Sequence, residues 1–243
     1  MKILLAPSET KSQGGDEAFD LSTLWLETLF KSRAYICQRY TDAIQDTSKA
    51  KEIFKLKKEN DIHHYQAIAL GSKTKKAVQR YTGVAFDHLE YNSLDANAQH
   101  YIDDNVIIFS NLFGPIKAGN KIPEYRLAQG SAIEEIELDR YYAPLIKEML
   151  DSEFEDEDIL DIRAGYYDRF YIPAKNYTTL KFIKDGKVVS HWAKAYRGLV
   201  LREIAKAKAA SIDAFMSLEI ENLHLEEIQT RKNRTEIIYR IEP

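Results

Sequence analysis

Glu9 and Lys11, near the start of the chain, carry side chains that could take part in catalysis. They lie two residues apart in the polar segment Ala6-Pro7-Ser8-Glu9-Thr10-Lys11, which follows a short apolar stretch. A carboxylate can act as a general acid or base, and a nearby amine can stabilise developing negative charge. A simple turn in which Glu9 has a capping role explains the same residues. The pattern leaves both interpretations open.

A second group of candidate residues lies in a helix predicted to begin near residue 193. Lys194, Gly198, Arg202 and Lys206 recur every four residues, so they form one row on its surface. Glycine inside a helix costs roughly 1 kcal/mol relative to alanine, which indicates a close approach to the helix at Gly198. Lysine and arginine near a helix start suit a phosphate backbone. A helix contact across Gly198, with the cations in solvent, explains the row equally well.

Several classes of site lack support in this sequence. It contains neither a Gly-x-x-x-x-Gly-Lys-Ser/Thr loop nor a Gly-x-Gly-x-x-Gly fingerprint, so triphosphate hydrolysis and dinucleotide binding have no motif. The single cysteine, Cys37, cannot form an intramolecular disulfide, and its neighbours predict a partly buried helix position. The six histidines show no metal-ligand spacing. We therefore predict no metal and no cofactor.

The composition is typical of an ordinary globular protein. Its 243 residues are 44% apolar, which is enough for a sizeable core, and no linker divides them, so we expect one domain over residues 1–243. No apolar run approaches the length of a membrane span, and residues 2–5 are too few for a signal-peptide core. We expect a cytoplasmic protein without a membrane partner. The sequence is silent on its oligomeric state.

The charges are unevenly distributed around a net charge of −4. An acidic run occupies residues 151–158, and three basic runs lie elsewhere. Their members are Lys49, Lys51, Lys55, Lys57 and Lys58; Lys73, Lys75, Lys76 and Arg80; and Lys194, Arg197, Arg202, Lys206 and Lys208. Such separation can place one positive face on an acidic protein, although charge runs are more often solvated helix faces.

The hydrophobic pattern predicts an α/β protein with a mixed central sheet and surrounding helices. Buried strands are expected at residues 2–6, 105–110 and 159–162, and a closing strand at 235–241. Residues 178–183 and 187–190 flank Asp185-Gly186 as a hairpin. Helices are expected over 21–79, interrupted near 47–48 and 60–61, and over 141–150 and 193–209. Ligands in such folds bind after the carboxyl ends of strands, which favours the segment after residue 6.

Short motifs follow one another in order along nearly the whole chain. They are Ala6-Pro7-Ser8-Glu9-Thr10-Lys11 with Gly14-Gly15, Arg80-Tyr81-Thr82-Gly83-Val84, Asn111-Leu112-Phe113-Gly114, Ile122-Pro123-Glu124-Tyr125-Arg126-Leu127, Asp161-Ile162-Arg163-Ala164-Gly165-Tyr166, and Ser190-His191-Trp192-Ala193-Lys194 with Arg197-Gly198. This set resembles the YaaA peroxide stress protein family, in particular a branch whose first strand leads into Pro-Ser-Glu-Thr-Lys. Within them we assign structural roles to Pro7, Gly14, Gly15, Gly83, Gly114 and Gly198.

The resemblance implies a cytosolic bacterial protein that limits peroxide damage, with a compact mixed α/β fold and a positively charged cleft that binds DNA. We expect contacts with duplex phosphates and little sequence preference, because no recognition helix is apparent. The cations expected around the cleft are Lys11, Arg126, Arg163, Lys194, Arg197 and Arg202. Another branch of the family has a lysine where this chain has Glu9, and a carboxylate there weakens phosphate binding unless Lys11 compensates.

An enzyme is the alternative hypothesis. Its pocket would gather Glu9, Lys11, Tyr125, Arg126 and Lys194 around a small phosphorylated or nucleotide-like substrate, with Glu9 and Lys11 in the catalytic roles. The excess of polar residues at loop positions favours this hypothesis. The family resemblance and the cationic row favour DNA binding.

Overall fold

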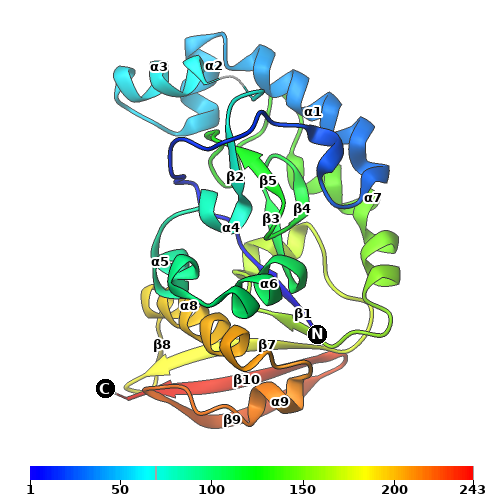
Figure 1. The fold of residues 1–243 in the computed structure, drawn as a ribbon, viewed down its shortest axis with the longest axis vertical. Coiled ribbons are helices and arrows are strands. Elements are labelled where there is room, and N and C mark those ends of the chain that lie inside the picture. The colour runs from blue at the N-terminus through cyan, green and yellow to red at the C-terminus, as the bar shows by residue number, and fades with distance from the viewer. Residues whose placement is uncertain (69, 243) are drawn as a thin grey trace.

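A central group of parallel strands organises the fold (Figure 1). The computed structural model describes residues 1–68 and 70–242. β1 (Lys2–Leu5) pairs in parallel with β3 (Val106–Ser110) on one side and with β6 (Ile159–Asp161) on the other. The side chains of Ile3 and Leu4 are fully buried, because a strand inside a parallel sheet is covered on both faces. The buried strands expected from these apolar runs are therefore confirmed.

Further strands extend this sheet on both sides. β7 (Tyr177–Lys184) follows β6 in parallel, β10 (Arg234–Ile241) follows β7, and β9 (Leu223–Arg231) closes that edge antiparallel to β10. β4 (Gly114–Lys117) lies antiparallel to β3 at the opposite edge. β8 (Lys187–Val188) pairs with β7 across Asp185-Gly186, where both residues have positive φ, as the predicted hairpin requires. β2 (Thr74–Lys76) and β5 (Lys121–Pro123) form a separate small sheet.

The helices of the first half of the chain connect β1 with β3. α1 (Phe30–Ala43), α2 (Thr47–Phe54) and α3 (Glu59–Ala67) gather at the end of the molecule farthest from β9 and β10 (Figure 1). The chain then returns through α4 (Ala77–Arg80), α5 (Val84–Leu89) and α6 (Ala96–Asn105). Short 3₁₀ helices occupy Leu21–Thr23, Glu27–Leu29 and Tyr91–Ser93. These helices thus connect β1 to β3, the strand that lies beside it in the sheet.

The second half of the chain builds the other side of the sheet. α7 (Leu138–Glu153) leads into β6, and the 3₁₀ helix η4 (Gly165–Arg169) follows β6. α8 (Ser190–Ala207) and α9 (Ile212–Met216) lie between the β7–β8 hairpin and β9. Over the described residues, none of the helices is both long and apolar enough to span a membrane. The expected mixed sheet with flanking helices is confirmed.

Gly198 is the point at which α8 packs against α5, and the two helices lie side by side in Figure 1. A Cβ atom at Gly198 would overlap the backbone carbonyl oxygen of Ala85 and would come within 3.0 Å of the Leu89 nitrogen. Of the two explanations for this glycine, the structure therefore supports the helix contact. The contact leaves no space at this position for a phosphate backbone.

Three sequence-based expectations about elements are wrong. The helical region expected over residues 21–79 contains 3₁₀ turns at its start and the strand β2 near its end. The hairpin's second strand ends at Val188 and α8 begins at Ser190, so strand and helix meet earlier than expected. The strands β4, β5 and β9 were not expected, since β4 and β5 are short and β9 is largely exposed.

Candidate functional site

A pocket of about 400 Å³ lies where the carboxyl ends of β1 and β6 open. The chain runs from β1 to β3 on one side of the sheet and later returns to β6 on the other side. This change of direction creates a crevice between the two strands, which is the usual ligand position in an open α/β sheet. The segments that follow the strands, Ala6-Pro7-Ser8 and Ile162 with Ala164, line the pocket. The expected ligand position after residue 6 thus coincides with a real cavity.

The pocket has an apolar part and a polar part. Its apolar walls are Leu5, Ala6, Pro7, Val84, Ala85, Phe86, Ile162, Ala164 and Tyr167. Its polar walls are Ser8, Glu9, Thr10, Thr82, Gly83, Gln129, Lys194 and Arg197. The polar residues come from three separate motifs of the sequence and from Gln129, which follows a fourth motif, and the fold brings them to one place. Ser8, Thr82, Gln129 and Tyr167 were not among the predicted site residues, although the motifs contain or adjoin all four.

The first loop is held in shape by the segment before α5. The backbone amide of Thr82 donates to the Thr10 carbonyl at 3.1 Å, and that of Ser12 donates to the Arg80 carbonyl at 2.8 Å. The hydroxyl of Thr82 lies 3.0 Å from that of Thr10, which lies 3.2 Å from that of Ser8. Gly83 has φ +104° and leaves room for the Ser8 hydroxyl, which a Cβ would approach to 3.3 Å. Three hydroxyl groups are consequently presented together at the pocket.

Arg80 belongs to this scaffold and not to a solvated basic face. Its side chain is fully buried, and its guanidinium donates to the carbonyls of Ser12, Gly14, Lys73 and Ile122. The loop after β1 is thereby tied to the small sheet of β2 and β5. The basic run that includes Arg80 therefore contributes no free arginine to a DNA-binding face.

Lys11 lies behind the pocket, with its amine turned inward. Its Nζ atom lies 3.9 Å from the centre of the Tyr125 ring and donates to the carbonyls of Ser8 at 3.2 Å and Glu9 at 3.3 Å. Burial lowers the pKa of this amine to about 7, and repulsion from Arg126 acts in the same direction. Lys11 is thus a poor direct phosphate contact, and it stabilises the loop by hydrogen bonds and a cation–π contact.

Glu9 is held by two partners. Its carboxylate accepts a hydrogen bond from Arg126 Nη2 at 2.9 Å and another from the backbone amide of Gln129 at 3.0 Å. Arg126 is buried and also donates to the Phe54 carbonyl at 3.3 Å. The Glu9 carboxylate therefore ties the first loop to residues 126–129, and it neutralises the cation expected at position 126. Of the alternative interpretations of Glu9, this geometry favours the structural one.

Arg163 forms a buried ion pair, which corrects its expected place among the DNA-binding cations. Both its Nε and Nη2 atoms donate to the Asp161 carboxylate, at 2.9 and 2.6 Å. The same guanidinium donates to the carbonyls of Tyr167 and Tyr171. Four hydrogen bonds hold the guanidinium within the protein, so Arg163 fixes the η4 segment that carries Tyr167 to the pocket.

Lys194 and Arg197 are the expected cations that do line the pocket. Among the residues whose side chains the structure describes, neither has an acidic partner within ion-pair distance. The Nε atom of Arg197 is buried and has no hydrogen-bond partner in that part of the chain, and burial lowers the pKa of its guanidinium. Arg202, farther along α8, pairs with Glu90 and does not line the pocket. The cations that line the pocket therefore lie near the start of α8, and the cation farther along the helix is paired.

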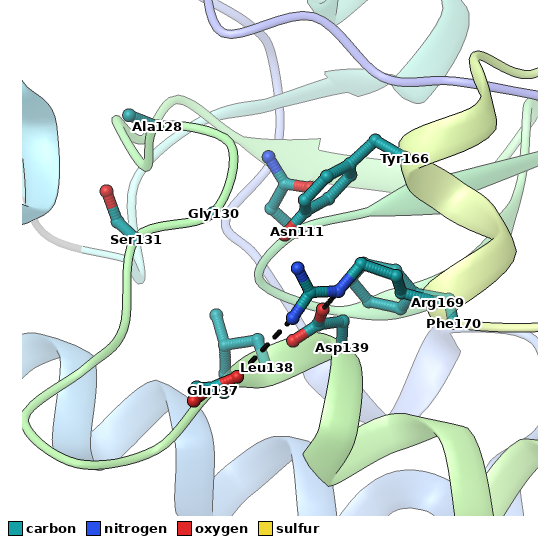
Figure 2. Close-up of a pocket in the computed structure, with 10 residues that line it drawn as sticks. All are labelled: Asn111, Ala128, Gly130, Ser131, Glu137, Leu138, Asp139, Tyr166, Arg169 and Phe170. Atoms are coloured by element: carbon teal, nitrogen blue, oxygen red, sulfur yellow. Dashed lines mark hydrogen bonds and ion pairs between the residues drawn. The ribbon is translucent and has the colours of Figure 1, made fainter.

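A smaller cavity of about 60 Å³ lies between η4 and the start of α7, where Tyr166 and Arg169 line it (Figure 2). Arg169 projects into it from η4 and forms ion pairs with Glu137 and Asp139 at the start of α7. The Tyr167 hydroxyl donates to Asn111, which lines the small cavity while Tyr167 lines the larger pocket. Sixty cubic ångströms suits a few water molecules and not a substrate. Its polar residues position η4 and α7.

Other residues singled out in the sequence have structural roles or lie away from the pocket. A Cβ at Gly15 would contact the Thr74 backbone and one at Gly114 would lie 3.0 Å from the Tyr142 ring, so both glycines allow close packing. Cys37 is half-buried in α1, and burial raises the pKa of its thiol to about 12. The described residues contain no group of three or more histidine, cysteine or acidic side chains that could hold a metal ion.

Comparison with known proteins places this arrangement in a family. A family model described as "Peroxide stress protein YaaA" matches residues 1–229. The chain belongs to the YaaA peroxide stress protein family. The first loop, the Thr82-Gly83 segment, the residues after β6 and the start of α8 all fall within the matched region. The pocket is therefore built by the part of the chain that carries the family match.

Relatives of this YaaA family member cover most or all of its length. "Uncharacterized protein Cj0984" of Campylobacter jejuni is 37% identical over 99% of both chains. UPF0246 proteins of Streptomyces coelicolor and Corynebacterium efficiens are 28% and 32% identical over 84% of this chain, and over 82% and 85% of their own lengths. None of these names specifies a ligand. The family description concerns peroxide stress.

Proposed function

We propose that this protein limits peroxide damage by binding duplex DNA through the phosphate backbone at the start of α8. The observation that carries the proposal is the pair Lys194 and Arg197, which line one pocket and have no acidic partner among the described side chains. Lysine and arginine supply most of the affinity in sequence-independent DNA binding, because they release counterions from the phosphates. The Ser8 hydroxyl adds a neutral phosphate donor beside them, whereas the hydroxyls of Thr10 and Thr82 donate within the protein.

Only two of the six cations that the resemblance implied around a cleft, Lys194 and Arg197, line the pocket. Lys11 and Arg126 are buried, and Arg163 and Arg202 are paired with acidic residues, so none of the four is a primary contact. A duplex would meet Lys194 and Arg197 at the rim, together with donors of the first loop. The number of phosphates neutralised should therefore be small.

The test is a titration of fluorescently labelled duplex DNA at several salt concentrations. Affinity should fall with a slope near −0.9 per phosphate neutralised, and Lys194→Ala and Arg197→Ala should each reduce that slope by about one. Arg202→Ala should change binding less, since Glu90 already offsets its charge. Lys31→Ala removes an exposed lysine of α1 and serves as the matched control. Salt-independent binding, or equal effects of Lys31→Ala and Lys194→Ala, contradicts the proposal.

A second candidate function is enzymatic. The observation in its favour is the Lys11 amine, whose pKa of about 7 allows proton transfer near neutral pH. The amine is directed toward Tyr125 and away from the pocket, so a substrate would reach it only after the first loop rearranges. Release of phosphate from p-nitrophenyl phosphate by the wild type, lost in Lys11→Met, supports this function. No release by the wild type contradicts it in this form.

A further inference from the structure

The pocket is more varied in chemistry than binding to a phosphate backbone requires. Its volume of about 400 Å³ lies in the range of small-molecule sites, which are mostly apolar with a few placed polar groups. Pro7, Val84, Phe86 and Tyr167 supply apolar and aromatic surface. Two rings and a proline suit a flat aromatic group, because such a group gains both apolar burial and ring contacts.

The polar part of the pocket suits a phosphate. Lys194 and Arg197 bring two positive charges, and Ser8 brings a hydroxyl donor. The Arg197 Nε atom is buried without a hydrogen-bond partner among the described residues, and burial of such a donor is costly. Ile162 and Ala164 close the pocket from the β6 side, and the Arg163–Asp161 pair holds that segment in place. A bare phosphate would leave the apolar walls uncovered.

We propose that this pocket binds one mononucleotide unit, with the phosphate at Lys194 and Arg197 and the base against Phe86 and Tyr167. Gln129 lies at the same pocket, and its side-chain amide has no hydrogen-bond partner in the described part of the chain, so it can meet the polar edge of a base. The position at the carboxyl ends of β1 and β6 agrees with nucleotide sites in other open sheets.

This inference deepens the proposed DNA binding and shares two cations with it. The nucleotide unit has two possible sources, a free mononucleotide and an unpaired nucleotide of a DNA strand. Both present the same phosphate and base to the pocket. A fully paired duplex differs, because its bases are stacked and only its phosphates can reach Lys194 and Arg197.

The first experiment is calorimetric titration with each of the four 2′-deoxynucleoside 5′-monophosphates, the matching nucleosides and inorganic phosphate. At least one monophosphate should bind about 10- to 100-fold more tightly than its nucleoside, because the nucleoside lacks the charge-assisted contacts. It should also bind more tightly than inorganic phosphate, which lacks the base. If no monophosphate binds more tightly than inorganic phosphate, the inference is overturned.

A filling substitution tests the location without removing a charge. Ala164→Phe places a ring in the pocket and should weaken mononucleotide binding by at least about tenfold. Ala174→Phe adds the same ring at an exposed alanine outside the pocket and should bind like the wild type. Circular dichroism confirms that both variants fold. Equal mononucleotide affinity in the two folded variants overturns the placement.

Duplex binding separates this inference from the proposed function. A fully paired duplex should bind Ala164→Phe and the wild type alike, because it uses only the rim. If mononucleotides bind and the paired duplex does not, the DNA-binding proposal fails and the pocket inference stands. If a duplex with one unpaired nucleotide binds more tightly than the paired duplex and a mononucleotide displaces it, DNA is the source. Equal binding of the two duplexes assigns the pocket to a free mononucleotide.

Discussion

Replacing the buried Lys11 with methionine should remove a specific pH dependence of stability. The pKa of this amine falls from 10.5 to about 7 in the folded protein, mainly because burial penalises its charged form. Between these values the unfolded chain binds a proton that the folded protein does not. Stability therefore rises with pH over this window, by at most about 1.4 kcal/mol per pH unit for one proton.

The expected size follows from the two pKa values. The contribution of Lys11 to the free energy of unfolding should increase by about 2 kcal/mol from pH 7 to pH 9, and by less than about 0.5 kcal/mol from pH 5 to pH 7. Below pH 7 both states are protonated, so the full cost of the buried charge is present and constant. Methionine has a similar length and no charge. The free energy of unfolding of Lys11→Met should therefore exceed that of the wild type by the largest amount at and below pH 7.

Urea unfolding of the wild type and Lys11→Met at pH 5, 7 and 9 measures this difference. The Cys37 thiol and the buried tyrosines also titrate differently in the two states, but their effects are common to both proteins and cancel in the difference. Lys31→Met, at an exposed position of α1, controls for the loss of one positive charge. A constant difference between wild type and Lys11→Met across pH 7 to 9 refutes the reasoning.

Three further predictions concern stability and reactivity. Arg163→Met should lower the free energy of unfolding by about 3–5 kcal/mol, since it leaves the Asp161 carboxylate buried without its partner; a loss below about 1 kcal/mol in urea unfolding would mean that the pair does not anchor this segment. Gly198→Ala should cost about 1–3 kcal/mol through overlap with α5, whereas Gly71→Ala, which adds a methyl group in open space, should unfold close to the wild-type temperature; equal melting temperatures for the two variants would contradict the tight helix contact. Burial raises the pKa of the Cys37 thiol to about 12, so at pH 8 a disulfide reagent should react far more slowly with folded protein than with protein in urea; similar rates would show that the thiol is accessible.

The sequence by itself determined the parts of the fold that depend on local pattern. The apolar runs of β1, β3 and β6 predicted buried strands, because a strand covered on both faces needs apolar residues at successive positions. Asp185-Gly186 predicted a hairpin turn, because two adjacent residues with positive φ favour such a pair. The polar segment after β1 was expected to form a ligand site, and it does line the pocket.

The sequence did not determine the pairing of β2 with β5. Each strand has only three residues, and those of β2 are a threonine and two lysines. So short a segment has no readable period, and its hydrogen bonds come from a strand more than forty residues away. The extended form of Thr74–Lys76 is thus a product of tertiary pairing.

Only the tertiary structure decided which cations are open to a ligand. Arg163 and Arg197 are the same residue type in similarly polar motifs, but Arg163 is held by Asp161 while Arg197 lines the pocket. Glu9 reaches Arg126 across 117 positions of the chain, and Gly198 is explained only by the carbonyl of Ala85. Ion pairs and close packing act over a few ångströms in space, so they depend on which segments the fold brings together and not on spacing along the chain.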